Sequence, residues 1–371
     1  ELLLRESLQA FLNASLKPAD RQESAELAIA RAAHAIELLS RQATAAKLAK
    51  RRGEDQRATM ILGRLDGPVP DGEVADQFTA AFDAVSLPLK WRNHQPEATV
   101  FDWTTTDRQL QWAAEHGLRA IAGPLIQLDE DSLPAWTAGM PFEEFEQAAI
   151  RYVKAALRQF AARIDIWVCA GRLNVSCTAP FSEEQKLRLA VALLEAAQTI
   201  HPHTPIVMSF DQPWAEYLAV EDFDLSPLHF ADALVRADLG VAGVAIELNL
   251  GYWPHGTQPR DSFDISQHLD RWSLLGIPLL VYLTLPSHLA IDNQTTRNPQ
   301  IVRHSDDAPD QPAVSQAAAQ QLISMLLTKP AVHGVIWNRW SDAVEHEFPQ
   351  AGLLDANGHP KPLLAQLASL R

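Results

Sequence analysis

Cysteine is scarce in this chain of 371 residues, which contains only Cys169 and Cys177. Two cysteines allow at most one disulfide bridge, and no spacing of cysteine with histidine is typical of a metal site. Cys169 lies within an apolar run, where a cysteine usually packs as a small buried residue and does not act as a nucleophile. We therefore expect neither a disulfide framework nor a metal ion.

Long apolar runs and an excess of positive charge are absent as well. No run of about 18 apolar residues is present, so we expect no transmembrane helix. The net charge is −15, and such a surface repels nucleic acid and has no attraction for anionic membranes. The sequence starts at Glu1 without a signal-like segment. A removed leader or upstream domain therefore stays an open question, as do the localisation and the oligomeric state.

Three motifs that would identify an enzyme class are missing. The chain has no G-x-S-x-G nucleophile elbow and no HExxH zinc motif. No glycine-rich phosphate loop follows the first predicted strand, which argues against a dinucleotide-binding fold. A Ser-His-Asp triad stays open as an alternative, although the histidines His94, His229 and His268 are scattered. We expect no cofactor.

A long helix is predicted at 20–52, where alanine, leucine, glutamate, lysine and arginine dominate and Gly53 follows. All five of these residue types favour helices. We interpret the segment as an accessory helix packed on the main domain, with a dimer contact as the alternative. The chain is accordingly divided into an N-terminal helical extension at 1–58 and a larger domain at 59–371.

From Thr59 onward, strands and amphipathic helices alternate. The predicted strands are 59–65, 82–91, 118–126, 164–171, 205–211, 241–250, 277–285 and 332–338. Helical patterns separate them, for example at 141–162, 182–200, 227–239, 263–275 and 313–328. Nearly continuous apolar strands indicate burial on both faces, as in a parallel sheet. Eight such strands, each followed by a helix, predict an α/β fold of the (β/α)8 barrel type, with a doubly wound open sheet as the alternative.

In such a barrel the active site lies at the carboxyl ends of the strands. The side chains at those positions are Lys90, Trp91, Gly123, Pro124, Arg172, Asn174, Asp211, Gln212, Trp214, Glu247, Asn249, Tyr252, Trp253, Thr284, Ser287, Trp337, Asn338, Arg339 and Asp342. The chain has ten tryptophans, and a flat indole matches the apolar face of a sugar ring. This favours a carbohydrate ligand, with Trp91, Trp214, Trp253 and Trp337 at the rim. The alternative, which we expect for most of the ten, is that they are ordinary core and surface residues.

One segment, at 90–124, carries a spaced pattern of aromatic, charged and glycine residues. The residues of this pattern are Lys90, Trp91, Pro96, Phe101, Trp103, Asp107, Trp112, Ala113, Gly117 and Gly123. In kind and spacing it resembles the family 10 glycoside hydrolases, the xylanase family. The segments "VIWNRWSD" and "GLLDANGHPKP" near the C-terminus resemble the eighth strand and closing motif of that family. The resemblance implies a (β/α)8 barrel and hydrolysis of a β-linked, xylan-like glycan.

Both catalytic glutamates of that family are replaced in this chain. Arg172 stands where the family has its acid/base glutamate, at the end of strand four. Glu247 resembles the nucleophile of strand seven, but another helix and strand, at 263–285, follow it before the last strand. Glu247 therefore belongs to strand six, where Asn249 matches a histidine of the family. The nucleophile position then falls at about Leu283.

A rebuilt acid pair is one hypothesis, because Glu247 and Asp211 end neighbouring predicted strands. Such strands lie about 4.8 Å apart, and glycoside hydrolysis needs two carboxyl groups about 5–9.5 Å apart. We expect burial to raise the pKa of Glu247, as suits a general acid, with Asp211 as nucleophile or base. Arg172 would hold a carboxylate ionised or bind an acidic substrate group. The alternative is a buried ion pair of Glu247 with Arg172, while Asp211 caps a loop.

Three functions remain open at this point. The first is a glycoside hydrolase with the rebuilt pair, which the strand-end carboxylates favour. The second is a carbohydrate-binding protein that has lost hydrolysis, and the third is a scaffold that docks through the helix at 20–52. For the first two, the predicted substrate-binding residues are Lys90, Trp91, Arg172, Asn174, Gln212, Trp214, Asn249, Trp253, Trp337, Arg339 and Asp342.

Overall fold

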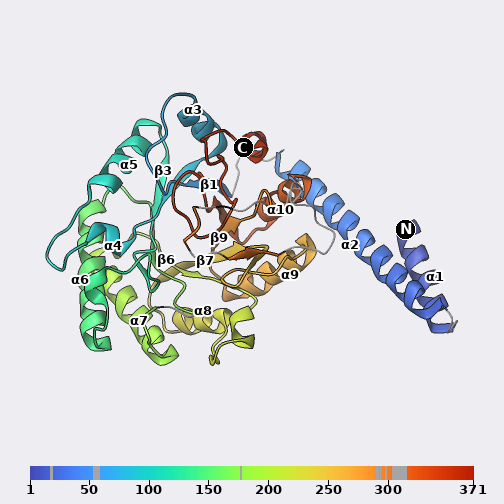
Figure 1. The fold of residues 1–371 in the computed structure, drawn as a ribbon, viewed down its shortest axis with the longest axis horizontal. Helices are drawn as coiled ribbons and strands as arrows, with labels where there is room; N and C mark the ends of the chain where they lie inside the picture. Colours follow the sequence, from blue (N-terminus) through green and yellow to red (C-terminus); the bar gives the residue numbers. More distant parts are fainter. Residues whose placement is uncertain are drawn as a thin grey trace.

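The computed structural model of the chain describes residues 1–16, 20–52, 59–175, 178–289, 292, 294–296, 299–302 and 316–371. Its centre is a closed barrel of parallel strands (Figure 1). The strands are β1 (Met60–Arg64), β2 (Ala84–Leu87), β3 (Arg119–Ala122), β5 (Ile166–Gly171), β6 (Ile206–Phe210), β7 (Val241–Asn249), β9 (Leu279–Thr284) and β11 (Val332–Trp337). Because β11 pairs with β1 and β3 pairs with β5, the sheet closes on itself. The predicted (β/α)8 barrel is confirmed, and the open sheet is wrong.

Helices surround this barrel and cover the outer faces of its strands (Figure 1). They are α3 (Gly72–Ala81), α4 (Trp91–His94), α5 (Thr104–Glu115), α6 (Phe142–Phe160), α7 (Glu183–Ile200), α8 (Pro227–Arg236), α9 (Ser262–Trp272), α10 (Gln316–Thr328) and α11 (Pro362–Leu370). The loops add the short strands β4 (Ile126–Gln127), β8 (Tyr252–Trp253) and β10 (Gln300–Ile301). The helix predicted at 313–328 is confirmed from Gln316, and its first three residues lie outside the described ones, as does Cys177. Within the described residues, no helix is both long and apolar enough to span a membrane.

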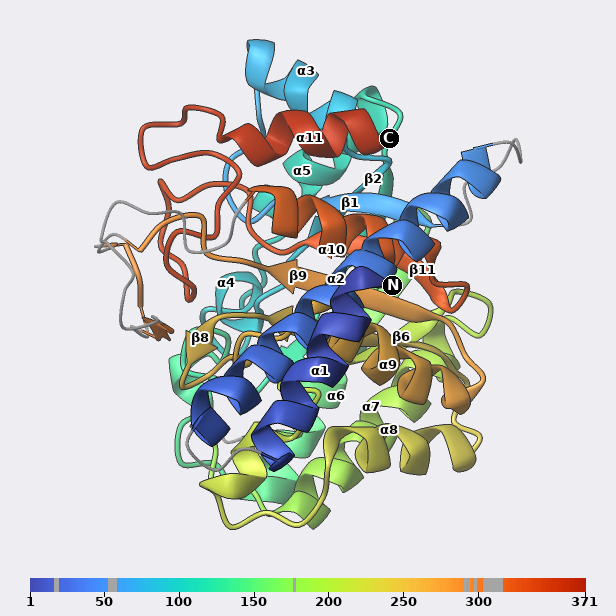
Figure 2. The ribbon, with the colours of Figure 1, turned by 90° about the vertical axis from the view of Figure 1, so that its right-hand side faces the viewer.

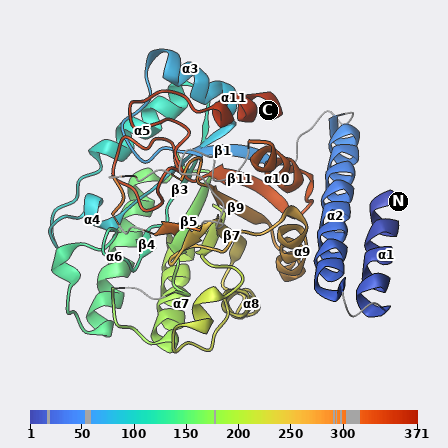
Figure 3. The same ribbon diagram turned by 45° about the vertical axis from the view of Figure 1, so that its right-hand side comes forward.

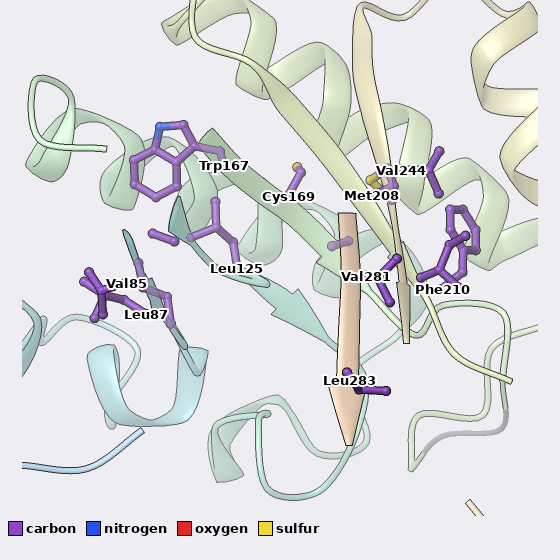
Figure 4. Packing of buried hydrophobic residues seen from close by; sticks show 14 of the residues in the cluster. Val85, Leu87, Leu125, Trp167, Cys169, Met208, Phe210, Val244, Val281 and Leu283 are labelled. Carbon is purple, nitrogen blue, oxygen red and sulfur yellow. The ribbon is translucent and has the colours of Figure 1, made fainter. Parts of the chain in front are cut away.

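The core has two layers, one outside the barrel and one inside it. Between the strands and the helices, side chains such as Trp167, Cys169, Phe210 and Leu283 pack together (Figure 4). Inside the barrel, each strand contributes at least one apolar side chain to a second cluster. The members of this inner cluster are Leu62, Ala84, Ile121, Val168, Val207, Ala245, Leu280, Tyr282 and Ile336. The lower part of the barrel is therefore filled and carries no channel.

A polar layer lies above this inner cluster, toward the carboxyl ends of the strands. Side chains alternate between the two faces of a strand, so the residue two positions after an inward-facing one also faces inward. Applied to the inner cluster, this rule gives Arg64, Ser86, Ser209, Glu247, Thr284 and Asn338. On six of the eight strands the barrel thus changes from an apolar floor to a polar mouth within one period of the strand.

The N-terminal segment forms a helical hairpin of α1 (Leu2–Leu16) and α2 (Arg21–Arg52) (Figure 2). The helix predicted at 20–52 is confirmed as α2, whereas α1 was not predicted as a separate helix. The helix α2 runs along α9 and α10 on the outside of the barrel, and α1 lies on its far side (Figure 3). The prediction of an accessory helix packed on the main domain is confirmed. The boundary predicted between 58 and 59 stays a prediction, because residues 53–58 lie outside the described ones.

Candidate functional site

A cavity of about 910 Å³ opens at the carboxyl ends of the strands, where the barrel architecture places an active site. Strand ends and the loops that follow β2 and β11 form its wall. Charged residues in that wall are Arg64, Asp66, Lys90, Arg92, Asp102, Asp129, Asp131, Arg172, Glu247, Arg339, Glu345 and Glu347. We call this cavity the cleft. Of the residues predicted to be catalytic or substrate-binding, four line it: Lys90, Arg172, Glu247 and Arg339.

Arg172 lies close to three carboxyl groups at the mouth of the barrel, those of Glu247, Glu347 and Asp211. It follows β5 in a left-handed backbone conformation, with φ 57°. Its Nη2 lies 2.6 Å and its Nε 2.7 Å from Oε2 of Glu247, and its Nη1 lies 2.5 Å from Oε2 of Glu347. Its Nε is also 3.5 Å from Oδ2 of Asp211. The predicted buried ion pair of Glu247 with Arg172 is confirmed. Glu347 forms a second ion pair, with the remaining guanidinium nitrogen.

Glu247 lies on β7, the sixth strand of the barrel in chain order, as the count of strands predicted. It pairs in register with Tyr282 of β9, the seventh strand, whose Leu283 points outward into the apolar core. No carboxylate therefore occupies the position predicted for the family nucleophile. On the other side, β7 pairs with β6, which ends beside Asp211.

Asn249 links the two candidate carboxylates. Its Nδ2 donates to Oδ1 of Asp211 at 2.9 Å and lies 3.4 Å from Oε2 of Glu247. Its Oδ1 accepts from the Thr284 hydroxyl at 2.6 Å, and Thr284 in turn accepts from Nδ2 of Asn338 at 3.1 Å. Every member of this chain is hydrogen-bonded to the next, which fixes the side chains across the mouth of the barrel.

The two carboxylates are perturbed in opposite directions. Burial alone would raise the pKa of Glu247, but the Arg172 guanidinium and hydrogen bonds from Arg172 and Ser209 lower it below its usual value. The prediction that burial raises this pKa is therefore wrong, because the charge and hydrogen bonds of Arg172 outweigh the effect of burial. Burial does raise the pKa of Asp211, to about 8, even though Arg172 opposes the shift. At neutral pH the site therefore holds an ionised Glu247 beside a protonated Asp211.

Asp211 also caps its own loop, as the alternative predicted. Its Oδ1 accepts from the backbone N–H of Gln212 at 2.7 Å. Asn174 donates to the backbone carbonyl of Asp211 at 2.8 Å and accepts from its N–H at 3.3 Å. Asp211, Asn174 and Gln212 are all buried, and none is among the residues that line the cleft. Their predicted roles toward a substrate stay predictions.

None of the four tryptophans predicted at the rim lines the cleft within the described structure, and their contact with a sugar stays a prediction. Trp91 is 1% exposed, stacks on Tyr152 and donates to Gln95 at 2.7 Å. Trp337 is 3% exposed and donates to the Ala351 carbonyl at 3.1 Å. Trp214 stacks on His268 beneath Arg260, and Trp253 lies in β8.

The loop after β11 forms one wall of the cleft and is held from beneath by two ion pairs. Arg339 lies 2.6 Å from Asp66 and donates to the carbonyls of Ser341 and Val344 at 2.8 and 2.5 Å. The second pair joins Asp342 to Lys361. Asp342 therefore positions the loop, and its predicted contact with a substrate stays a prediction.

Asp292, Asp342 and His346 offer ligand atoms within 4.8 Å of one another, a spacing that would suit a metal ion. Each is already paired, because Nε2 of His346 lies 2.9 Å from Asp292 and the Lys361 ammonium lies against Asp342. A divalent ion at this place would repel that ammonium. The donor set fits an ion-pair network better than a metal site.

Sequence reasoning missed Arg64, and it placed Glu347 near the rim without its partner Arg172. Arg64 ends the first strand in the inward register of Leu62, so the alternation of the strand contained the signal. Glu347 lies in an irregular loop, where no periodicity indicates the direction of a side chain.

Solved structures that are similar to this chain include several xylanases. Xylanase 10B from Thermotoga maritima has a TM-score of 0.61 at 15% identity, over 88% of this chain and 96% of that chain. Xylanase 10B from Thermotoga petrophila RKU-1, in complex with xylobiose, has a TM-score of 0.60 at 15% identity, over 87% of this chain and 95% of that chain. A xylanase from Paenibacillus barcinonensis, complexed with a conduramine derivative, has a TM-score of 0.62 at 14% identity, over 87% of this chain and 97% of that chain.

These similarities cover nearly the whole length of each xylanase. No family model matches the chain, and neither does any curated protein. The resemblance to family 10 is confirmed for the fold: the chain is a xylanase-like (β/α)8 barrel. At such low identity the likeness shows the fold alone, and the activity has to be argued from the cleft.

Proposed function

We propose that the chain binds a carbohydrate in the cleft without hydrolysing it. The observation that carries this proposal is the state of the two carboxylates at the centre of the cleft wall. Glu247 and Glu347 both bind the same guanidinium, that of Arg172. A group held in this way is ionised and already has a strong partner.

Glycoside hydrolysis needs a carboxylic acid that protonates the leaving oxygen and a second carboxyl that acts as nucleophile or base. Glu247 does not suit the first role, because its pKa is lowered. To act as a nucleophile, Glu247 would have to break its ion pair with Arg172, and this would leave a buried charge without a partner. The site thus keeps the shape of a glycosidase cleft while its reactive groups bind one another.

A carbohydrate ligand is supported by the shape and the polarity of the cleft. Its volume of about 910 Å³ lies at the upper end of the range of small-molecule sites. Its wall offers amide, hydroxyl and charged groups, including Asn93, Gln109, Ser132 and Asn338, which match the donors and acceptors of sugar hydroxyls. The Thermotoga petrophila xylanase of the same fold has been solved with xylobiose.

Hydrolysis through the rebuilt pair is the second candidate, and one observation favours it. The pKa of Asp211 is raised to about 8 beside an ionised Glu247, and two carboxyl groups with separated pKa values are typical of glycosidases. Against it, Asp211 is 2% exposed and is not among the residues that line the cleft. A ligand would have to displace the Arg172 network to reach its proton.

Two assays on the same panel of β-linked oligosaccharides, xylan fragments first, separate these functions. Calorimetry measures binding, and a reducing-end assay measures turnover, each for the parent chain, Glu247→Gln and Asp211→Asn. We expect saturable binding by the parent without release of reducing ends. Release that disappears in both variants would establish the hydrolase. If the folded chain binds none of the glycans, both carbohydrate functions are excluded and the scaffold function remains.

A further inference from the structure

We infer that helix α1 is a self-association surface, and that a row of leucines along it binds the same row of a second copy of this chain. The row consists of Leu4, Leu8, Leu12 and Leu16, and we call it the leucine ridge. This inference does not depend on the proposed function, because no residue of α1 lines the cleft. It starts from an inverted arrangement in the N-terminal hairpin: α1 turns its small side chains toward α2 and its large apolar ones away from the chain.

The face of α1 that packs on α2 is built from small side chains. The Ser7 hydroxyl donates to the backbone carbonyl of Ala28 in α2 at 2.8 Å. Ala10 and Ala14 follow Ser7 on the same face, one and two helical turns later, and are 4% and 8% exposed. The distance between two packed helices depends on the side chains at their contact. Small side chains therefore let α1 and α2 approach closely, and the hairpin closes without burying any leucine of the ridge.

The leucine ridge lies on the side of α1 that faces away from α2. Residues four apart form a continuous row on a helix surface, and the four leucines are 41–76% exposed. Phe11 lies beside the row and is 60% exposed. The next row is polar and bonded within itself, because Arg5 lies 2.7 Å from Glu1 and Gln9 donates to Asn13 at 3.4 Å. An apolar centre with a polar rim is typical of a protein–protein interface.

Exposed apolar side chains are concentrated in this hairpin. Among the described residues, eleven exposed large apolar side chains belong to α1 and α2, and six belong to the rest of the chain. Soluble proteins rarely leave a large contiguous apolar patch uncovered. The helix α1 lies on the far side of α2 from the barrel (Figure 1 and Figure 3). No part of the described barrel therefore covers the ridge.

A second copy of the chain supplies the surface that the ridge needs. A row of residues four apart packs into the groove beside an identical row, which is the commonest geometry of helix pairs. A two-fold rotation brings the ridge against itself and closes the contact in a dimer. Charge permits this pairing, because the segment from Ser7 to Leu16 contains no charged residue. A lipid surface fits less well, since helices that bind one are rich in lysine and arginine, whereas here Arg5 is accompanied by Glu1 and Glu6.

Sedimentation equilibrium of the full chain over a dilution series measures the dimer. We expect a reversible equilibrium between monomer and dimer. Leu8→Glu should raise the dissociation constant at least about hundredfold, because the dimer loses two buried leucine side chains and gains two buried carboxylates. Leu274→Glu is the matched control, since this leucine is 85% exposed outside the hairpin. Its replacement should leave the dissociation constant unchanged.

A mixing experiment tests whether the ridge faces its own copy. Leu8→Lys alone should also be monomeric. Mixing it with Leu8→Glu should restore part of the dimer, since opposite charges then meet across the two-fold axis. Because Leu8 is exposed in the single chain, both variants should keep the circular dichroism spectrum of the parent.

Three results would overturn the inference. The first is a parent chain that stays monomeric at every concentration, and the second is a Leu8→Glu chain that dimerises as well as the control. The third is a mixture of the two Leu8 variants that stays monomeric. A monomeric parent that binds phosphatidylcholine vesicles, and loses this binding in Leu8→Glu, would assign the ridge to a lipid surface instead.

Discussion

Arg172 is the residue on which the chemistry of the cleft depends most. It follows the fourth barrel strand, where the resemblance of the sequence to the xylanases implies a glutamate. Its left-handed backbone, with φ 57°, directs the guanidinium back across the mouth toward three carboxylates. A buried arginine with such partners is costly to remove, because the carboxylates stay behind without compensation.

Replacing Arg172 by methionine should therefore destabilise the fold. We expect a loss of about 3–5 kcal/mol in the free energy of unfolding at pH 7, as for other buried pairs that lose one partner. Urea denaturation measures the change. Arg236→Met, which breaks an exposed pair with Asp232 at 2.6 Å, should change stability by less than about 0.5 kcal/mol. Equal losses in the two variants would show that the Arg172 network does not stabilise the folded state.

Asp211 predicts a dependence of stability on pH. In the unfolded chain an aspartate releases its proton at about pH 3.9, whereas in the folded chain Asp211 keeps it up to about pH 8. Between these values the folded state binds more protons than the unfolded state, so the free energy of unfolding falls as the pH rises, by up to about 1.4 kcal/mol per pH unit.

Asp211→Asn removes this proton and keeps an acceptor for the N–H groups of Gln212 and Asn249. The difference in unfolding free energy between parent and variant should grow in favour of the variant from pH 6 to pH 8. Chemical denaturation at pH 6, 7 and 8 measures it. Parallel curves over this interval would mean that Asp211 is ionised throughout.

At the scale of elements, the strands of the barrel were predictable because they are apolar on both faces. The strands predicted at 164–171 and 241–250 are strands Ile166–Gly171 and Val241–Asn249 in the structure. The helix α1 was not predicted, since Leu4, Leu8 and Phe11 are exposed while Ala10 and Ala14 are buried. Apolar residues on both sides of a helix give no single stripe, and the stripe is what pattern analysis detects.

Removal of residues 1–58 should leave the cleft intact. No residue before Arg64 lines it within the described part of the chain, and α2 contacts the barrel from outside, on α9 and α10. We expect the shortened chain to unfold cooperatively and to bind glycans within about twofold of the parent affinity, as for sites without shared partners. Calorimetry and gel filtration measure both properties. Lost binding would assign the hairpin a part in the site, and a change in oligomeric state would support the dimer contact.

At the scale of the whole molecule, the fold was more predictable than the site. The alternation of strands and helices and the spaced motif at 90–124 were enough to identify a xylanase-like barrel, which the comparison of structures confirmed. The centre of the cleft was harder, because ion pairs across the mouth depend on loops. The pKa of Glu247 was predicted in the wrong direction for this reason, since the strength of its ion pair with Arg172, which comes from a distant part of the chain, could not be judged from the sequence.

The measurement that tests the central claim most directly joins binding and turnover in one sample. The full chain is titrated in a calorimeter with a xylo-oligosaccharide, and the contents of the cell are then analysed by mass spectrometry after prolonged incubation. We predict saturable binding and recovery of the oligosaccharide at its original length. Shortened products that are absent with Glu247→Gln would contradict the account and show that the rebuilt carboxylates hydrolyse the glycan.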